Sequence, residues 1–205
     1  MYHVGWPSEE LITKLKQSTV YLVPKLYRDK NHDKRDFLWR YAFNKGEKKL
    51  LTDRDSTIVN SCRREVVCIL KGFLSDFEWP GLRSYHMKTI MLHEFESFGD
   101  SDKWQKSEEA ERVLSAVRRL KTCLTQNPPK LKHYFLPSIN ILESINEEQK
   151  QQFLDRIKKF LENPQAEVTK LVEGHSSSSM KKVNRFSFLF YLRSSPLASQ
   201  FAFIS

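Results

Sequence analysis

Apolar residues recur every three or four positions through the middle of the chain, the spacing that predicts helices packed along one face. The longest apolar stripe consists of Ile58, Cys62, Val66, Ile69, Leu70, Phe73, Leu74 and Phe77. Trp79-Pro80-Gly81 then ends the pattern, because proline and glycine interrupt helices. We therefore predict one long helix over about 58–77.

Three further helices are predicted after it. Ser84 can act as the N-cap of the first, which breaks at Gly99-Asp100. The second runs from about Ser107 to Thr125, with its apolar face formed by Val113, Leu114, Val117, Leu120 and Leu124. The third begins at Asn146, which has capping-box spacing to Gln149. Its core-facing residues are expected to be Phe153, Ile157, Phe160 and Leu161.

The amino-terminal part carries a mixed pattern. Ser8 is a good N-cap for a short amphipathic helix that reaches about Gln17. The 19–23 run is rich in residues that favour strands and is stopped by Pro24. The apolar 37–43 run is a second strand candidate that leads into a helix.

These elements predict a mainly α fold, a helical bundle with a short β remnant at its amino-terminal end. We divide the chain into residues 1–43, a helical domain over 44–173 and a low-complexity tail over 174–205. The tail is rich in Phe and Ser without a helical or strand period, so we expect it to be disordered or aberrant. Arg193 and Pro196 interrupt its apolar stretches, and no membrane span is expected.

Composition narrows the class of protein. Of 205 residues, 40% are hydrophobic and 29% charged, which is typical of a soluble globular protein. The net charge of +9 favours nucleic acid, nucleotide phosphates or an acidic membrane surface as partners, although a solvated basic face explains it equally well. Three cysteines without a signal peptide indicate a reducing compartment, so we expect a cytoplasmic protein, with the nucleus as the alternative.

Several short segments occur in a recognisable order. They are Tyr21-Leu22-Val23-Pro24-Lys25, Trp39-Arg40-Tyr41-Ala42-Phe43-Asn44 with Glu47-Lys48, Cys62-Arg63-Arg64 continuing to Leu70-Lys71, Ser84-Tyr85-His86-Met87-Lys88-Thr89, and Tyr134-Phe135-Leu136-Pro137. From about Gly5 to Asn163 the chain thus resembles the carboxy-terminal half of the cyclic GMP-AMP synthase and male abnormal 21-like nucleotidyltransferase group. The resemblance implies that 44–173 is the helical lobe and that 1–43 is a remnant of the nucleotidyltransferase core.

Enzymes of this group join ATP and GTP into cyclic dinucleotides in the innate immune sensing of nucleic acid. Their other lobe carries a Gly-Ser loop for phosphates and three carboxylates that hold two Mg²⁺ (or Mn²⁺) ions. This chain has neither the loop nor the paired acidic motif; Asp53 and Asp55 have the spacing but lie in a predicted loop, so we interpret them as a solvated turn. We expect no cofactor in this chain, the metal ions only with the missing catalytic half, and no product from this polypeptide alone.

The resemblance also implies a nucleotide site. The matching positions are Arg40, Asn44, Glu47, Lys71, Ser84, Tyr85 and Lys88. A planar guanidinium suits bidentate pairing with a purine or phosphate, a tyrosine ring can stack on a base, and a helix start offers free N–H groups to phosphate. Ion pairing, helix capping, a core tyrosine and solvated lysines are the ordinary alternatives for the same residues.

One position departs from the enzymes of the group. Ala42 stands where they carry Ser, which removes one hydroxyl contact and weakens any inference about base preference.

Six basic residues cluster around the start of the long helix: Lys45, Lys48, Lys49, Arg54, Arg63 and Arg64. Relatives use such a face to bind double-stranded nucleic acid, often RNA, through salt-sensitive phosphate contacts. A solvated basic surface is the alternative.

We predict no zinc site. The 52–61 stretch, where cyclic GMP-AMP synthase carries its zinc-binding insertion, holds neither His nor Cys, which also disfavours DNA sensing of the vertebrate kind. Cys62 and Cys68 are too far apart for a zinc knuckle and are expected to be buried thiols. His86 and His93 lie two helical turns apart without an evident acidic or thiol partner.

Three classes of function remain open. The chain can be the base-binding lobe of a cyclic-dinucleotide-forming sensor, a non-catalytic scaffold that binds nucleotide, nucleic acid or protein, or a general nucleic-acid-binding helical module. Family membership alone does not decide, because one fold hosts both catalytic and non-catalytic proteins.

Overall fold

A computed structural model describes residues 6–28, 35–52, 61–76, 81–99, 101–164 and 166–167. Several sequence predictions fall outside these residues: the helical pattern before Ser61, the Trp79-Pro80 stop, the Asp53/Asp55 turn, Arg54 and the 174–205 tail.

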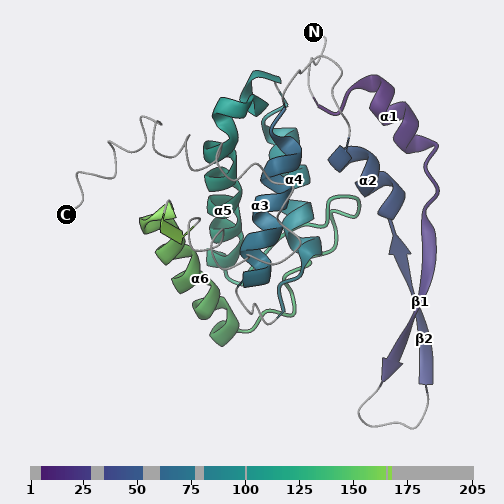
Figure 1. Ribbon diagram of the computed structural model, residues 1–205. Coiled ribbons are helices and arrows are strands. Elements are labelled where there is room, and N and C mark those ends of the chain that lie inside the picture. The colour runs from purple at the N-terminus through teal and green to yellow at the C-terminus, as the bar shows by residue number, and fades with distance from the viewer. Residues whose placement is uncertain are drawn as a thin grey trace.

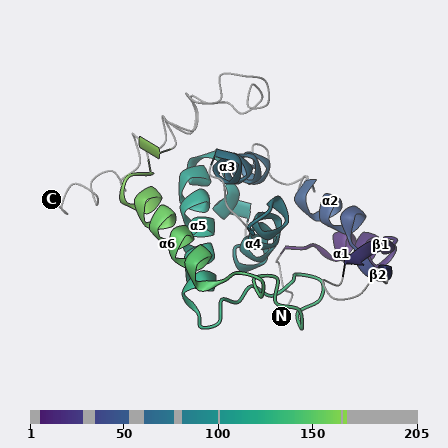
Figure 2. The ribbon, with the colours of Figure 1, turned by 90° about the horizontal axis from the view of Figure 1, so that it is seen from below.

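Four helices form a bundle in the described part of the chain (Figure 1). They are α3 (Arg63–Asp76), α4 (Ser84–Ser97), α5 (Glu109–Thr125) and α6 (Glu147–Glu162). In Figure 2, which looks along the bundle, α5 lies between α6 and the α3–α4 pair. The predicted mainly α fold with a short β element at the amino-terminal end is confirmed.

The bundle core is aromatic and aliphatic. Its largest fully buried side chains include Trp104, Phe73, Phe95, Phe153 and Phe160. All five predicted inward residues of α5 are buried, whereas Leu161 of α6 packs only at the edge of the core.

Two short 3-10 helices, η1 (Ser101–Trp104) and η2 (Lys106–Glu108), lead into α5. Trp104, the last residue of η1, is fully buried in the core. Its Nε1 donates a hydrogen bond to the Phe98 carbonyl at 2.6 Å. We predicted a helix from about Ser107 to Thr125, and α5 covers Glu109–Thr125 directly after η2.

The amino-terminal part consists of α1 (Glu9–Lys16), β1 (Tyr21–Arg28), β2 (Arg35–Ala42) and α2 (Asn44–Thr52). The strands form one antiparallel ribbon with Tyr21 opposite Ala42 and Arg28 opposite Arg35. The ribbon projects beyond α2 and away from the bundle (Figure 1). We expected Pro24 to stop the first strand, but β1 continues through it, because each strand of a two-stranded ribbon is an edge strand, where proline is tolerated.

Helix caps agree only partly with the sequence pattern. Ser8 accepts a hydrogen bond from the Leu11 N–H, and Asn146 and Gln149 form the predicted capping box. Ser84, in contrast, is the first residue of α4 rather than its cap.

The position before α4 belongs to Arg83, whose N–H donates to His86 Nδ1 at 2.9 Å, while its carbonyl accepts from the His86 N–H. Gly81 precedes this turn with a φ of +97°, in the left-handed region that glycine adopts without strain.

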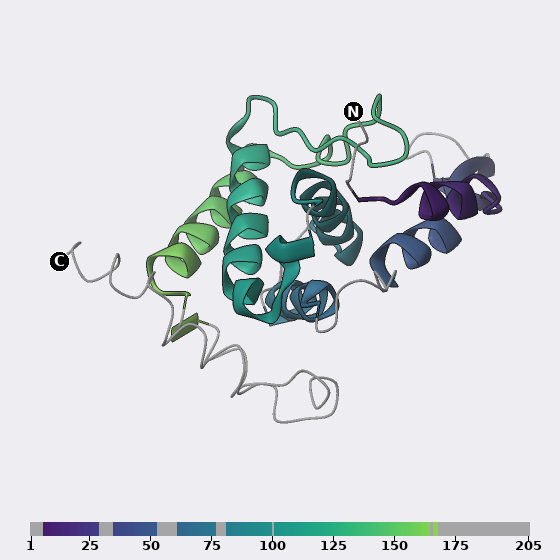
Figure 3. The same cartoon turned by 90° about the horizontal axis from the view of Figure 1, so that it is seen from above.

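The segment between α5 and α6 has little regular structure, and the Asn140 side chain makes three hydrogen bonds within it. Asn140 Oδ1 accepts from the Leu131 and Leu142 N–H groups, and its Nδ2 donates to the Pro129 carbonyl. In Figure 3 this segment runs past α4 toward α1 and α2. Within the ranges given above, no helix combines the length and apolar character needed to cross a membrane.

Candidate functional site

The end of β2, the start of α2, the first turn of α4 and the α5–α6 segment meet at one place. Phe43, between β2 and α2, stacks on Phe135 of the α5–α6 segment with ring centroids 4.6 Å apart. The Phe135 ring also packs over Gly46 of α2. This contact brings the candidate residues of β2 and α2 beside those of α4.

Glu47 and Lys88 form an ion pair across the two helices. Lys88 Nζ lies 3.2 Å from Glu47 Oε2, and only 7% of the Glu47 side chain is exposed, against 31% of Lys88. Helix capping was the ordinary alternative for Glu47. Its carboxylate instead binds Lys88, and Asn44 is the exposed first residue of α2.

Tyr85 lies next to this pair. Its ring is half-buried, and burial raises the pKa of its hydroxyl to about 12, with the Glu47 charge adding to the rise and the Arg40 charge opposing it. Both charges therefore act on the tyrosine. Arg40 itself is exposed on β2, opposite Val23.

His133 is a member of the site that the sequence analysis missed. Its Nε2 lies 2.5 Å from the Tyr85 hydroxyl oxygen, and its ring packs edge-on against Phe43. Partial burial lowers the pKa of His133, while the Glu47 charge opposes the shift. The signal available in the sequence was its position directly before the Tyr134-Phe135-Leu136-Pro137 element.

Of the seven predicted nucleotide residues, the structure brings four together, namely Arg40, Glu47, Tyr85 and Lys88. We call this group, with His133, the Tyr85 cluster. Of the other three, Lys71 is exposed on α3, and Asn44 and Ser84 are exposed at the starts of α2 and α4. The nucleotide-binding roles of all seven residues stay predictions from the family resemblance.

The predicted basic cluster divides into residues with different surroundings. Arg63 is only 5% exposed, and its guanidinium lies over the rings of Trp6, Phe95 and Trp104 at 5.3–5.7 Å. Arg63 is therefore excluded from the candidate nucleic-acid surface, because its charge is enclosed by aromatic side chains.

The lysines of α2 also have local partners. Lys45 lies over the Tyr21 ring, and Lys49 donates to the Lys14 carbonyl and the Ser18 hydroxyl at the end of α1. Lys48 of α2 and Arg64 of α3 have exposed side chains.

The histidines of α4 bind carbonyl groups. His86 Nε2 lies 3.0 Å from the Ile141 carbonyl oxygen, and His93 Nε2 lies 3.0 Å from that of Lys132. Burial lowers the pKa of His86, which favours its neutral form. Both rings therefore fasten the α5–α6 segment to α4.

Among the residues that the structure describes, no three His, Cys, Asp or Glu side chains lie together in a group that could hold a metal ion. Cys62 is fully buried, and burial raises the pKa of its thiol to about 12, which disfavours the thiolate that metals bind. Cys68, predicted to be buried, is only partly so.

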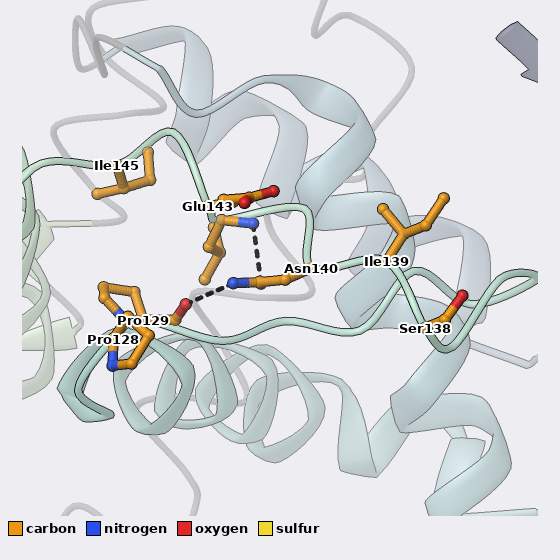
Figure 4. Close-up of a pocket in the computed structure, with 8 residues that line it drawn as sticks. Pro128, Pro129, Ser138, Ile139, Asn140, Glu143 and Ile145 are labelled. Carbon is orange, nitrogen blue, oxygen red and sulfur yellow. Dashed lines mark hydrogen bonds between the residues drawn. The ribbon is translucent and has the colours of Figure 1, made fainter.

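A separate open cavity of about 420 Å³ lies where α5 ends (Figure 4). Its walls are Pro128, Pro129, Ser138, Ile139, Asn140, Leu142, Glu143 and Ile145. None of the predicted site residues lines it, and the Asn140 amide that reaches toward Pro129 in Figure 4 is already hydrogen-bonded.

The chain is similar in sequence to proteins of known family. Residues 62–159 match the Mab-21 protein HhH/H2TH-like domain. The chain is 26% identical over 165 residues to cyclic GMP-AMP synthase of Mus musculus, a match that covers 74% of this chain and 32% of the relative. It is 27% identical to protein mab-21-like 3 of Danio rerio, covering 63% of this chain and 33% of the relative.

The alignment with a third relative covers a larger share of both proteins. Cyclic GMP-AMP synthase-like receptor 3 of Stylophora pistillata is 26% identical over 81% of this chain and 49% of its own length. The matches thus cover from 32% to 49% of the length of these relatives.

Proposed function

The chain belongs to the family of cyclic GMP-AMP synthase and the mab-21-like proteins, and from this premise we propose that it binds an ATP- or GTP-type nucleotide at the Tyr85 cluster. The observation that carries the proposal is the Glu47–Lys88 pair beside a half-exposed tyrosine and an exposed arginine. Three elements separated in sequence supply these side chains.

Each group suits one part of a nucleotide. The Tyr85 ring offers a face for a base, and the Arg40 guanidinium can pair bidentately with phosphate or with a purine edge. Lys88 supplies a mobile point charge for phosphate oxygens, and the Glu47 carboxylate can accept hydrogen bonds from a base. Phosphate binding would compete with Glu47 for the Lys88 ammonium.

Arg40 gives the cleanest test, because it is exposed and its removal should not disturb folding. We expect Arg40→Ala to weaken ATP or GTP binding about tenfold, since a hydrogen bond to a charged group contributes about 1.5–3 kcal/mol. The matched control is Arg64→Ala, an exposed arginine on α3. Titration calorimetry that finds equal affinity for both variants would contradict the proposal.

The wider role proposed is that of the base-binding helical lobe of a cyclic-dinucleotide-forming sensor in innate immunity, located in the cytoplasm or, alternatively, the nucleus. The sequence contains no Gly-Ser loop followed by paired acidic residues, so Mg²⁺ or Mn²⁺ would be held by residues beyond those present here. We expect this chain to make no cyclic dinucleotide when it is incubated with ATP, GTP, Mg²⁺ and double-stranded RNA. Chromatographic detection of such a product would refute this part.

The second candidate function is a non-catalytic module that binds nucleic acid or protein. The exposed side chains of Lys48 and Arg64 favour it, because positive charges at the surface attract the phosphates of nucleic acid. We expect any binding of double-stranded RNA to weaken steeply as salt rises and to fall further in the Lys48→Glu/Arg64→Glu double variant. Gel-shift titrations that show salt-independent binding would exclude the phosphate-contact account.

A further inference from the structure

His133 has its two ring nitrogens in different surroundings. The backbone N–H groups of Phe135 and Leu136 both point at Nδ1, each with a nitrogen–nitrogen distance of 3.1 Å. A ring nitrogen that accepts two hydrogen bonds must carry a lone pair rather than a proton. In neutral histidine the proton then lies on Nε2.

This assignment fixes the direction of the bond to Tyr85. The Nε2–H group donates to the Tyr85 hydroxyl oxygen over 2.5 Å. The opposite direction would require a proton on Nδ1, where it would face two N–H donors. Backbone groups of the α5–α6 segment therefore set the tautomer, and the tautomer makes His133 a permanent donor to the tyrosine.

Packing holds His133 in this position. Its ring lies between the Tyr85 ring, with centroids 5.5 Å apart, and the Phe43 ring, also 5.5 Å away. Phe43 is in turn stacked on Phe135. The tyrosine hydroxyl thus contacts a group of packed rings that consists of Phe43, between β2 and α2, and His133 and Phe135 of the α5–α6 segment.

We propose that His133 is a positioning residue that holds the Tyr85 ring in the orientation needed to stack on a nucleotide base. The proposal rests on the nucleotide site proposed above, and it adds the α5–α6 segment to that site. Protonation of His133 would replace the Nδ1 lone pair by a donor, so the same contacts predict weaker nucleotide binding when the ring is charged. The Glu47 charge acts on His133 and the Tyr85 hydroxyl contacts it, while Arg40 acts on Tyr85 and Lys88 pairs with Glu47.

The test compares four variants of the full chain by ATP and GTP titration. His133→Phe keeps the ring but removes the donor, and we expect affinity to fall about five- to tenfold, the effect of losing one hydrogen bond. Tyr85→Phe should cause the same loss, and the double variant should bind no more weakly than either single variant. His133→Gln, whose amide can accept from the backbone and donate to the tyrosine, should restore affinity to within about twofold of the wild type.

His93→Phe is the matched control, because His93 also joins α4 to the α5–α6 segment through the Lys132 carbonyl but does not contact Tyr85. We expect its nucleotide affinity to stay within about twofold of the wild type. An equal loss in His93→Phe and His133→Phe would mean that both act only by anchoring the segment, and would overturn the positioning role.

Two further results separate the possible failures. If Tyr85→Ala binds nucleotide as well as the wild type, the proposed site fails and the positioning role fails with it. If Tyr85→Ala loses binding while His133→Phe does not, only the role of His133 is overturned. The ring ¹⁵N chemical shifts of His133 give an independent check, because a protonated Nδ1 in the neutral ring would contradict the assigned tautomer.

Discussion

Large aromatic side chains are buried in the helical bundle but exposed on the amino-terminal ribbon. In the bundle, Phe73, Phe95, Phe153 and Phe160 are almost completely enclosed. In the ribbon, the side chain of Trp39, which is also large and aromatic, is 65% exposed. The difference shows that apolar composition alone did not decide burial here; the number of elements available to cover a face did.

The register of the ribbon explains the contrast. Leu22 lies opposite Tyr41 and Pro24 opposite Trp39, so these four residues share one face of the two strands. All four are exposed, which makes a continuous apolar surface on the ribbon. Apolar surfaces of this kind commonly mark sites of association.

The largest expected effect separates the two regions directly. Phe73→Ala should lower the free energy of unfolding by about 3–5 kcal/mol, because it removes a buried ring that packs edge-on against Phe160 and leaves a cavity. Trp39→Ala, an equally drastic truncation on the ribbon, should change it by less than about 0.5 kcal/mol. Urea unfolding followed by circular dichroism measures both. Similar losses in the two variants would mean that the ribbon is buried in solution.

Ion pairs should show the same contrast on a smaller scale. Arg119 binds Glu94, whose side chain is only 1% exposed, so Arg119→Met leaves a buried carboxylate without its cation. We expect a loss of about 1–3 kcal/mol, less than for a fully buried pair because Arg119 is partly exposed.

The control for this prediction is Lys14→Met on α1, which breaks an exposed pair with Glu10. It should leave the urea midpoint nearly unchanged, because solvent screens an exposed ion pair. Equal urea midpoints for the two variants would show that Glu94 finds another partner or solvent when Arg119 is removed.

A still smaller effect comes from a helix cap of the bundle. Asn146→Ala removes the side-chain oxygen that accepts from the Gln149 N–H at the start of α6, and should destabilise the protein by about 1 kcal/mol. Asn146→Asp keeps the acceptor and should be nearly neutral. If thermal unfolding shows the same shift for both variants, the cap contributes nothing to stability.

Local signals in the sequence predicted the bundle well. The capping box at Asn146 and the three- and four-residue spacing in α5 involve residues close in sequence, and both appear in the structure as expected. The ribbon was harder to predict because the length of each strand depends on its pairing with the other strand. Pro24 does not stop β1, because β1 has a neighbouring strand on one side only.

The site was predictable only in part, for a related reason. The motif around Tyr85 identified residues on α4, but the burial of Arg63 depends on rings at Trp6, Phe95 and Trp104 that no local pattern connects. His133 lies 48 residues from Tyr85 in sequence, so only the folded chain shows that they touch.

The last prediction concerns the pH dependence of the stability that His133 contributes. Its ring connects the two regions, because it contacts Phe43 beside α2 and Tyr85 on α4. Its pKa in the folded protein is lowered by burial, against the opposing charge of Glu47. The unfolded chain therefore takes up a proton on this residue at about pH 6.5, before the folded chain does, and the stability that His133 supplies is lost as the pH falls through that value toward the folded pKa.

The difference in unfolding free energy between the wild type and His133→Phe should consequently be greatest near pH 7.5 and narrow toward pH 5.5. His86, whose pKa burial also lowers, is present in both proteins, as are Glu47, Arg40 and Lys88, so their contributions cancel to first order. Urea unfolding at three pH values measures the gap. A free-energy difference that stays constant from pH 5.5 to pH 7.5 would mean that the His133 ring accepts a proton equally well in the folded and unfolded chains. The stabilising contact between His133 and Tyr85 would then not depend on a neutral imidazole ring.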